Sequence, residues 1–176
     1  GEVRIADNEK ILTVDRKGTV EILPYNEAIN KNEENSVVKR NVRLTSSIIG
    51  GVHSFKGWSF ADGSYTDNTM VHNFDGDVLL GCGNFMFKEG TGCKEITGYS
   101  SIVDVKEVPE SGSTDFPLLL DDLAAKRGKL YALKLRSGKY AVIEIGTFTS
   151  TSSFTSGESF ELTFYYKYQP SGSRIF

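Results

Sequence analysis

The chain has 176 residues, of which 39% are hydrophobic and 24% are charged, and its formal net charge is -3. A chain of this length is expected to form a single domain, 1–176, with a core large enough to need no disulfide. Charges of both signs are spread along it without a basic stripe, so nucleic acid is not expected as a partner. No apolar run approaches the ~18 residues of a membrane-spanning helix, so no membrane span is expected.

The N-terminal segment is predicted to form a hairpin at 3–23 that packs on the rest of the domain. Its two apolar runs, 11–14 and 19–23, flank a four-residue turn that ends with Gly18. The residues that follow, 26–35, are polar and predict a surface loop.

Short apolar runs in the middle of the chain predict further strands. They are bounded by Gly-Gly, Asp-Gly and Pro, which form turns or end strands. The expected strands lie at 37–49, 52–60, 70–74, 78–87 and 102–108.

One short helix is predicted at 116–126. Asp115 is a suitable N-cap and Pro117 suits the first turn. Lys126 lies in the last turn, and Gly128 follows as a stop signal. We expect this helix to cover an open end of the β structure.

The last third of the chain contains the clearest pattern. Two apolar-rich runs, 130–136 and 139–145, are joined by the pair Ser137-Gly138. Two such runs around two turn residues predict a β-hairpin with a type I′ turn.

A Ser/Thr-rich loop is expected next, at 147–159, and a longer strand at 160–168. The even positions of this strand are apolar or aromatic, and most of its odd positions are polar. A period of two predicts one buried face and one wet face. The predicted fold class is therefore all-β, a mostly antiparallel β-sandwich or partly open barrel with one short helix.

Two histidines and two methionines are the candidate ligand-binding residues. His53 and His72 lie on predicted strands, Met70 is two residues before His72, and Met86 lies on the next strand. Two imidazoles, or an imidazole with a thioether, are what axial ligation of haem iron uses. The alternative is that all four are ordinary half-exposed strand residues.

The two cysteines, Cys82 and Cys93, have a spacing that fits no zinc pattern. They could form a disulfide if the glycine-rich segment between them folds back, which requires an oxidising compartment. The alternative is two separate, half-buried thiols.

Motifs for catalysis and for metal binding are not found in the sequence. Gly81-Cys-Gly83 and Gly90-Thr-Gly92 do not open a helix, so they are interpreted as turn or bulge glycines rather than phosphate loops. There is no Gly-x-Ser-x-Gly elbow for a nucleophile. We therefore expect neither an enzyme nor a metal centre.

The C-terminal hairpin is similar to a pattern in HmuY-like proteins. The matching runs are Gly128-Lys-Leu-Tyr-Ala-Leu-Lys-Leu-Arg-Ser-Gly-Lys-Tyr-Ala-Val-Ile-Glu-Ile145 and Phe164-Tyr-Tyr-Lys-Tyr-Gln-Pro-Ser-Gly-Ser-Arg174. The resemblance covers about the last fifty residues, and the tryptophan that the family has before its strand aspartate is Gly76 here. It implies an extracytoplasmic β-rich protein, secreted or lipid-anchored in a cell envelope, with haem as cofactor. The matching motif is structural, so it assigns no ligand residue.

Two functions follow from these patterns. The first is a secreted or envelope-anchored module that binds a small hydrophobic ligand, with haem or another porphyrin as the specific candidate. The second is a structural or adhesive β domain that recognises a protein or glycan surface and holds no small molecule. An apolar cavity with His or Met at its mouth would favour the first function, and a flat sheet face without a cavity the second.

Overall fold

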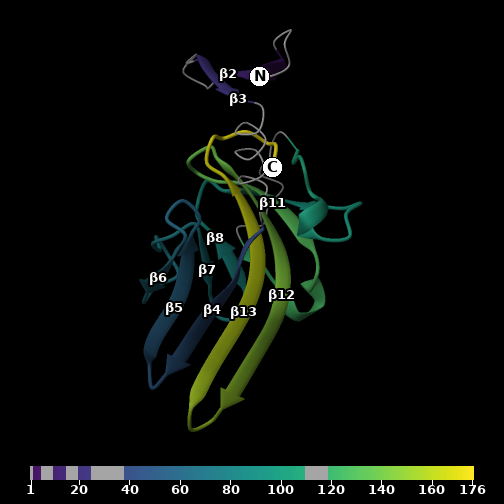
Figure 1. Cartoon of the computed structure of the whole chain (residues 1–176). Coiled ribbons are helices and arrows are strands. Elements are labelled where there is room, and N and C mark those ends of the chain that lie inside the picture. The colour runs from purple at the N-terminus through teal and green to yellow at the C-terminus, as the bar shows by residue number, and fades with distance from the viewer. Residues whose placement is uncertain (1, 5–9, 15–19, 25–37, 110–118) are drawn as a thin grey trace.

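The structure, a computed structural model, describes residues 2–4, 10–14, 20–24, 38–109 and 119–176 (Figure 1). Its described part is built of antiparallel strands, which form a curled, half-barrel sheet and confirm the all-β prediction. No helix in these residues is long and apolar enough to cross a membrane.

The N-terminal strands form a small antiparallel sheet of three. They are β1 (Glu2–Arg4), β2 (Lys10–Val14) and β3 (Val20–Pro24), in that order. Strands β2 and β3 pair as the predicted hairpin, while its turn and the polar loop 26–35 lie outside the described residues. That this hairpin packs on the rest of the domain stays a prediction.

The other strands form a ten-stranded antiparallel sheet. Their order across the sheet is β10-β8-β7-β5-β4-β13-β12-β11-β9, and β6 pairs with β5. The strands are β4 (Lys39–Ile49), β5 (Val52–Ser59), β6 (Ser64–Asn68), β7 (Val78–Leu80), β8 (Phe85–Phe87), β9 (Gly92–Ile96), β10 (Leu119–Leu120), β11 (Leu130–Lys134), β12 (Tyr140–Ser153) and β13 (Gly157–Gln169).

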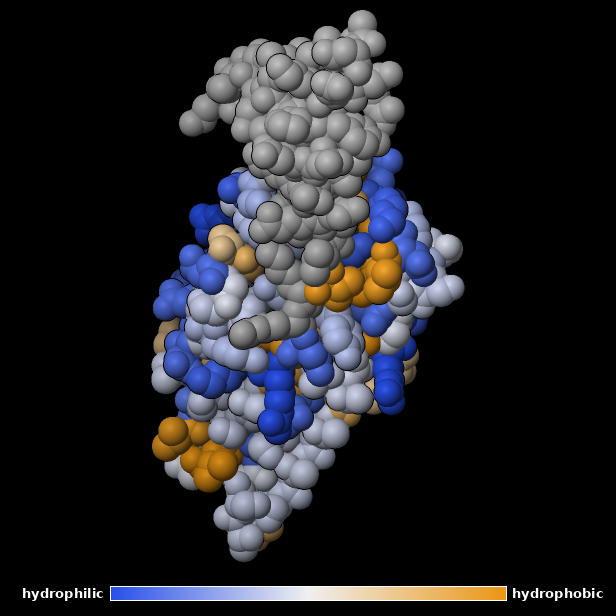
Figure 2. All heavy atoms as spheres, viewed as in Figure 1, coloured by the Kyte–Doolittle hydropathy of each residue, from blue (hydrophilic) through white to orange (hydrophobic). Residues whose placement is uncertain are grey.

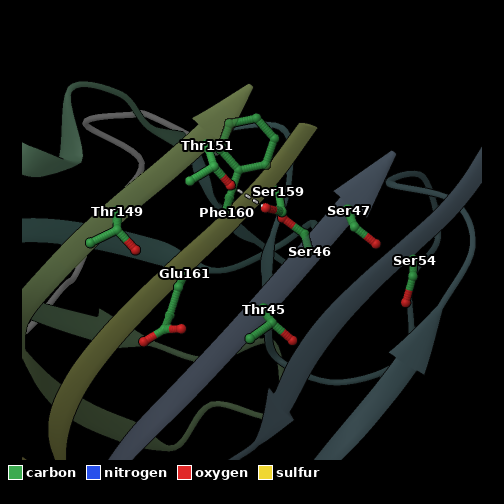
Figure 3. Close-up of a pocket in the computed structure, with 9 residues that line it drawn as sticks. All are labelled: Thr45, Ser46, Ser47, Ser54, Thr149, Thr151, Ser159, Phe160 and Glu161. Carbon is green, nitrogen blue, oxygen red and sulfur yellow. Dashed lines mark hydrogen bonds between the residues drawn. The ribbon is translucent and has the colours of Figure 1, made fainter. Parts of the chain in front are cut away.

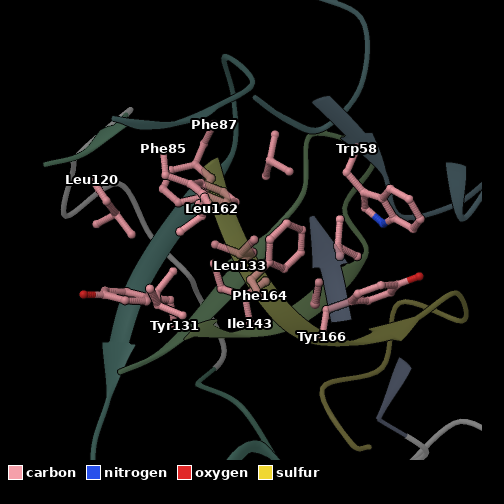
Figure 4. Close-up of a cluster of buried hydrophobic side chains, with 14 of the residues drawn as sticks. Trp58, Phe85, Phe87, Leu120, Tyr131, Leu133, Ile143, Leu162, Phe164 and Tyr166 are labelled. Carbon is pink, nitrogen blue, oxygen red and sulfur yellow. The ribbon is translucent and has the colours of Figure 1, made fainter. Parts of the chain in front are cut away.

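The main core lies on one face of β13 and its neighbours (Figure 4). Leu162, Phe164 and Tyr166 are buried there, as the period of two predicts. The ring of Phe164 meets that of Phe85 edge-on, with 5.3 Å between centroids. Aromatic side chains from strands that are distant in the sequence therefore close the curled sheet around one cluster.

A second cluster covers part of the opposite face. The segment 102–108 packs there with the C-terminal Phe176 over β11 and β12. It was expected to be a strand, but it begins with a 3-10 turn, η1 (Ile102–Asp104), and only Glu107 forms an isolated bridge, with Ile175.

Lys167 lies beneath this segment. The prediction that the odd positions of β13 are exposed to water is therefore wrong at this residue. Its side chain is fully buried, and its ammonium group donates to the carbonyl oxygens of Val103 (3.2 Å) and Val105 (2.9 Å). Burial, and next the positive charge of Lys106, lower the pKa of Lys167. The lysine thus holds the covering segment to the sheet through two backbone acceptors.

The predicted α-helix at 116–126 is wrong in its described part. Leu119 and Leu120 form the edge strand β10, which pairs with β8, and Leu123–Lys126 is a single 3-10 turn, η2. Between them Asp122 has a left-handed backbone with φ of 52°, which an α-helix does not allow. Pairing with an exposed sheet edge outweighs helical propensity here.

The hairpin of β11 and β12 is confirmed, but its turn is not of type I′. The Gly138 amide donates to the Leu135 carbonyl, and the Leu135 amide donates to the Lys139 carbonyl. Of the two turn residues, only Gly138 has a positive φ, 81°. This is a type I turn followed by a glycine bulge, which spares Ser137 the left-handed conformation.

The loop predicted at 147–159 is also wrong. Most of it is not a loop, because β12 continues to Ser153 and β13 already begins at Gly157. The two strands make a long hairpin that extends toward the same end of the molecule as the hairpin of β4 and β5 (Figure 1).

Replacing Phe164 by alanine is expected to lower the free energy of unfolding by about 3–5 kcal/mol, because the ring is fully buried and its loss leaves a cavity. Tyr165→Ala is the matched control, since Tyr165 is 38% exposed on the other face of the same strand. Urea denaturation of both variants measures the difference. A larger loss for Tyr165→Ala would show that the faces of β13 are reversed.

Candidate functional site

The four predicted ligand residues do not form one site. His53 lies on β5, is exposed, and meets Phe55 edge-on with 5.9 Å between ring centroids. Met70 is 63% exposed in the loop between β6 and β7. Neither side chain lines either of the two grooves described below.

His72 lies in the same loop rather than on a strand, so the strand predicted at 70–74 is wrong. The side chain of Asn68 accepts from the Asp75 amide (2.7 Å) and donates to the Asp75 carbonyl (3.2 Å). These bonds close the chain between the two residues into a loop. The parity argument that placed Met70 and His72 on one strand face therefore does not apply.

His72 and Met86 do share a groove, with a volume of about 360 Å³. Met86 is partly buried on β8, and His72 is exposed. The cationic side chains of Lys88 and Arg136 also line this groove. Lys88 is held in place because its ammonium group donates to the Phe74 carbonyl. This groove offers one imidazole and one thioether beside two positive charges and the carboxylate of Glu89.

The two cysteines are free thiols, so the disulfide is not formed. Cys82 is exposed in the turn between β7 and β8, whereas Cys93 is buried on β9 in the main core. Burial raises the pKa of Cys93 to about 12. Partial burial, and next the charge of Glu158, raise the pKa of Cys82.

A second candidate site lies on a polar face of β12, β13, β4 and β5. Strand register aligns its side chains in two rows across the sheet. In the first row Thr149 lies opposite Glu161, and Glu161 lies opposite Thr45. The next row consists of Thr151, Ser159, Ser47 and Ser54, in that order. We call these seven residues the hydroxyl face.

The hydroxyl face borders an open groove with a volume of about 380 Å³ (Figure 3). Its side chains are exposed or half-buried, so their hydroxyl groups are accessible to a ligand. Neighbouring strands lie about 4.8 Å apart, and alternate residues along a strand about 6.8 Å apart. The sheet thus presents hydroxyl groups at regular spacings in two directions.

The floor of this groove is held from behind by two side chains. Ser46 and Phe160 lie between the rows, and strand alternation directs their side chains to the opposite face. Ser46 is buried and donates to the Gly81 carbonyl at 2.8 Å. Phe160 stacks on Phe148, with 6.4 Å between centroids and 12° between ring planes. The backbone that carries the hydroxyl face is therefore anchored to the core.

One ion pair marks the inner end of the groove. Glu161 accepts from the Arg43 guanidinium at 2.6 Å, and both side chains are accessible to water. The hydrogen bond from Arg43 lowers the pKa of Glu161, and the same bond raises the pKa of Arg43. The groove therefore contains a fixed carboxylate acceptor beside its hydroxyl groups.

The hydroxyl face is not among the sites predicted from the sequence, because the Ser/Thr-rich run 147–159 was interpreted as a loop. A usable signal was present: Thr147, Thr149 and Thr151 alternate with Phe148. Ser159 and Glu161 likewise flank Phe160. Such alternation is typical of a half-buried strand.

The cysteine assignment predicts that a thiol reagent modifies one cysteine in the native protein and two after denaturation. Cys82 is exposed, whereas Cys93 is 4% exposed and its pKa of about 12 leaves almost no thiolate. Absorbance of the released chromophore counts the thiols. The Cys82→Ser variant should show no reaction while folded, and modification of Cys93 in that variant would contradict the assignment.

Comparison with known proteins adds no relative to this picture. No protein-family model matches the chain, and no curated protein matches it in sequence. Among the described residues, no group of three or more His, Cys, Asp or Glu side chains is placed to hold a metal ion. The two grooves are therefore the features from which a function is inferred.

Proposed function

We propose that this protein is an extracytoplasmic binding module that recognises a hydroxyl-rich, uncharged ligand, a glycan, on its hydroxyl face. The observation that carries this proposal is the pair of side-chain rows across four strands. The proposed function is surface recognition, in which a sheet face and not a closed cavity receives the ligand.

The chemistry of the hydroxyl face suits a sugar. Serine and threonine hydroxyl groups both donate and accept hydrogen bonds, as sugar hydroxyl groups do. The Glu161 carboxylate, oriented by Arg43, adds an ionised acceptor, which forms stronger hydrogen bonds than a neutral one. A chain of sugars can satisfy these groups at several points along the groove.

The expected affinity is modest and depends on many contacts. Each net hydrogen bond contributes about 0.5–1.5 kcal/mol, because both partners exchange water for one another. The side chains involved are short and stand on a paired sheet, so little rotamer entropy is lost on binding. Binding therefore depends on both rows of the hydroxyl face together.

The double variant Thr45→Val plus Thr149→Val tests this proposal. Valine keeps the shape of threonine and removes its hydroxyl group, so binding of a neutral tetrasaccharide of glucose or galactose should weaken at least tenfold, or about 1.4 kcal/mol. Titration calorimetry or ligand-detected NMR measures the affinity.

Thr97→Val is the matched control, because Thr97 is exposed after β9, two strands away from β12. It should bind like the unmodified protein. Absence of binding to either tetrasaccharide, or equal affinity in the double variant, would contradict the proposal.

A second candidate function is haem binding in the groove of His72 and Met86. This is favoured by one observation: an imidazole and a thioether line the same groove as Lys88 and Arg136. A histidine and a methionine are an axial ligand pair of haem iron, and two cations suit the two propionates of a porphyrin. His53 and Met70 have no part in this version.

Haemin titration followed by absorbance tests this second candidate. A sharpened Soret band is expected, and His72→Ala should abolish it, whereas the control His53→Ala should keep it. A flat titration would rule out this groove as a haem site.

A further inference from the structure

The face that carries the hydroxyl rows continues into an apolar row at its outer end. Two residues beyond Ser47 along β4 lies Ile49, which pairs with Val52 at the start of β5. On the neighbouring strand β13 the same row continues through Gly157, where a β-carbon would lie 2.2 Å from the Ile48 carbonyl oxygen and 3.1 Å from the Ile49 α-carbon. Ile49 is 49% and Val52 69% exposed, so the groove has an apolar rim.

A third apolar side chain lies at the same end of the molecule. Phe154 is in the turn between β12 and β13 and is fully exposed. The two hairpins end side by side, because β13 pairs with β4 as far as Glu158 opposite Ile48 (Figure 1). The apolar patch at the tip of the β4–β5 hairpin is visible in Figure 2. We call Ile49, Val52 and Phe154 the apolar tip.

The two hairpin ends carry few charged side chains, although 24% of the chain is charged. Neither 44–55 nor 145–157, the segments that form both hairpin ends, contains an Asp, Glu, Lys or Arg. The nearest charge is the exposed Glu158 at the start of β13, which lies opposite Ile48 and which strand alternation directs away from the hydroxyl face. Surfaces that bind anionic lipid use clustered lysine and arginine, so the apolar tip suits an uncharged surface.

We propose that the ligand of the hydroxyl face is the headgroup of a neutral glycolipid, with the apolar tip inserted in the surface of the bilayer. This inference rests on the proposed glycan recognition and specifies its ligand. Side chains such as Phe, Ile and Val partition into the boundary between headgroups and acyl chains. A sugar that projects from that boundary would meet the two hydroxyl rows directly behind the tip.

A second copy of the chain is a less suitable occupant. A stable protein interface uses about 20–30 residues a side and a well-packed apolar centre. The apolar tip consists of three side chains on two narrow hairpin ends. An area of this size suits shallow insertion in a lipid surface, where the hydroxyl groups behind it supply the specificity.

Vesicle flotation tests this inference. Phosphatidylcholine vesicles with and without galactosyl or glucosyl diacylglycerol are the probes, and the soluble glycosylglycerol headgroup is measured in parallel by calorimetry. The unmodified protein should float with the glycolipid vesicles and not with phosphatidylcholine alone. Its apparent affinity for the vesicles should exceed that for the soluble headgroup at least tenfold, and added salt should not change it.

Two variants separate the parts of the inference. The tip variant Ile49→Thr plus Val52→Thr plus Phe154→Ser changes only exposed residues, so it should fold, lose flotation at least tenfold and keep headgroup affinity. The groove variant Thr45→Val plus Thr149→Val should lose both. Thr97→Val should lose neither.

Four results would overturn the inference, and they differ in what they leave standing. The inference fails if the tip variant floats as well as the unmodified protein, or if the unmodified protein floats equally well without glycolipid. Either result would leave glycan recognition intact. Concentration-dependent dimers that disappear in the tip variant would assign the tip to a second copy. If neither the headgroup nor the tetrasaccharides bind, glycan recognition fails as well.

Discussion

The register of β13 between β12 and β4 is the constraint on which the rest of the structure depends. Side chains of a strand alternate between two faces, so a slip of one residue would exchange all of them. In the observed register Phe164 points into the main core and Glu161 points into the groove. The same alternation places Lys167 under the covering segment at the other end of the strand.

A bulge in β12 adjusts this register. Ile145 pairs with Phe164 and Phe148 pairs with Leu162, so two residues of β12 lie opposite Thr163 alone. The inserted residue reverses the alternation along β12. Ile145 and Phe148 therefore both face the core, and the threonines beyond them face the groove. Gly146 permits the bulge, because a β-carbon there would lie 2.4 Å from the Thr163 hydroxyl and 2.8 Å from its carbonyl oxygen.

The sequence predicts those parts of this fold that are determined by local pattern. The alternation in 160–168 was sufficient to predict β13. The two apolar runs around Ser137 were sufficient to predict the β11–β12 hairpin. The strand at 119–120 could not be predicted, because its partner β8 is distant in the sequence. The Ser/Thr-rich run was misinterpreted because its composition is typical of loops and because the bulge at Gly146 breaks the alternation between this run and the apolar run 139–145. The hydroxyl face, which combines four strands, depends on that run and on tertiary pairing.

The most direct test of this account is the mapping of amide chemical shifts while a neutral tetrasaccharide is added. The account predicts that the perturbed amides lie at 45–47, 149–151 and 159–161, on three adjacent strands of the sheet. Amides at 71–74 and 86–89, around the groove of His72, should stay unchanged. Perturbation of the His72 groove alone, or of no amide, would contradict the claim that the rows set by the register of β13 form the binding surface.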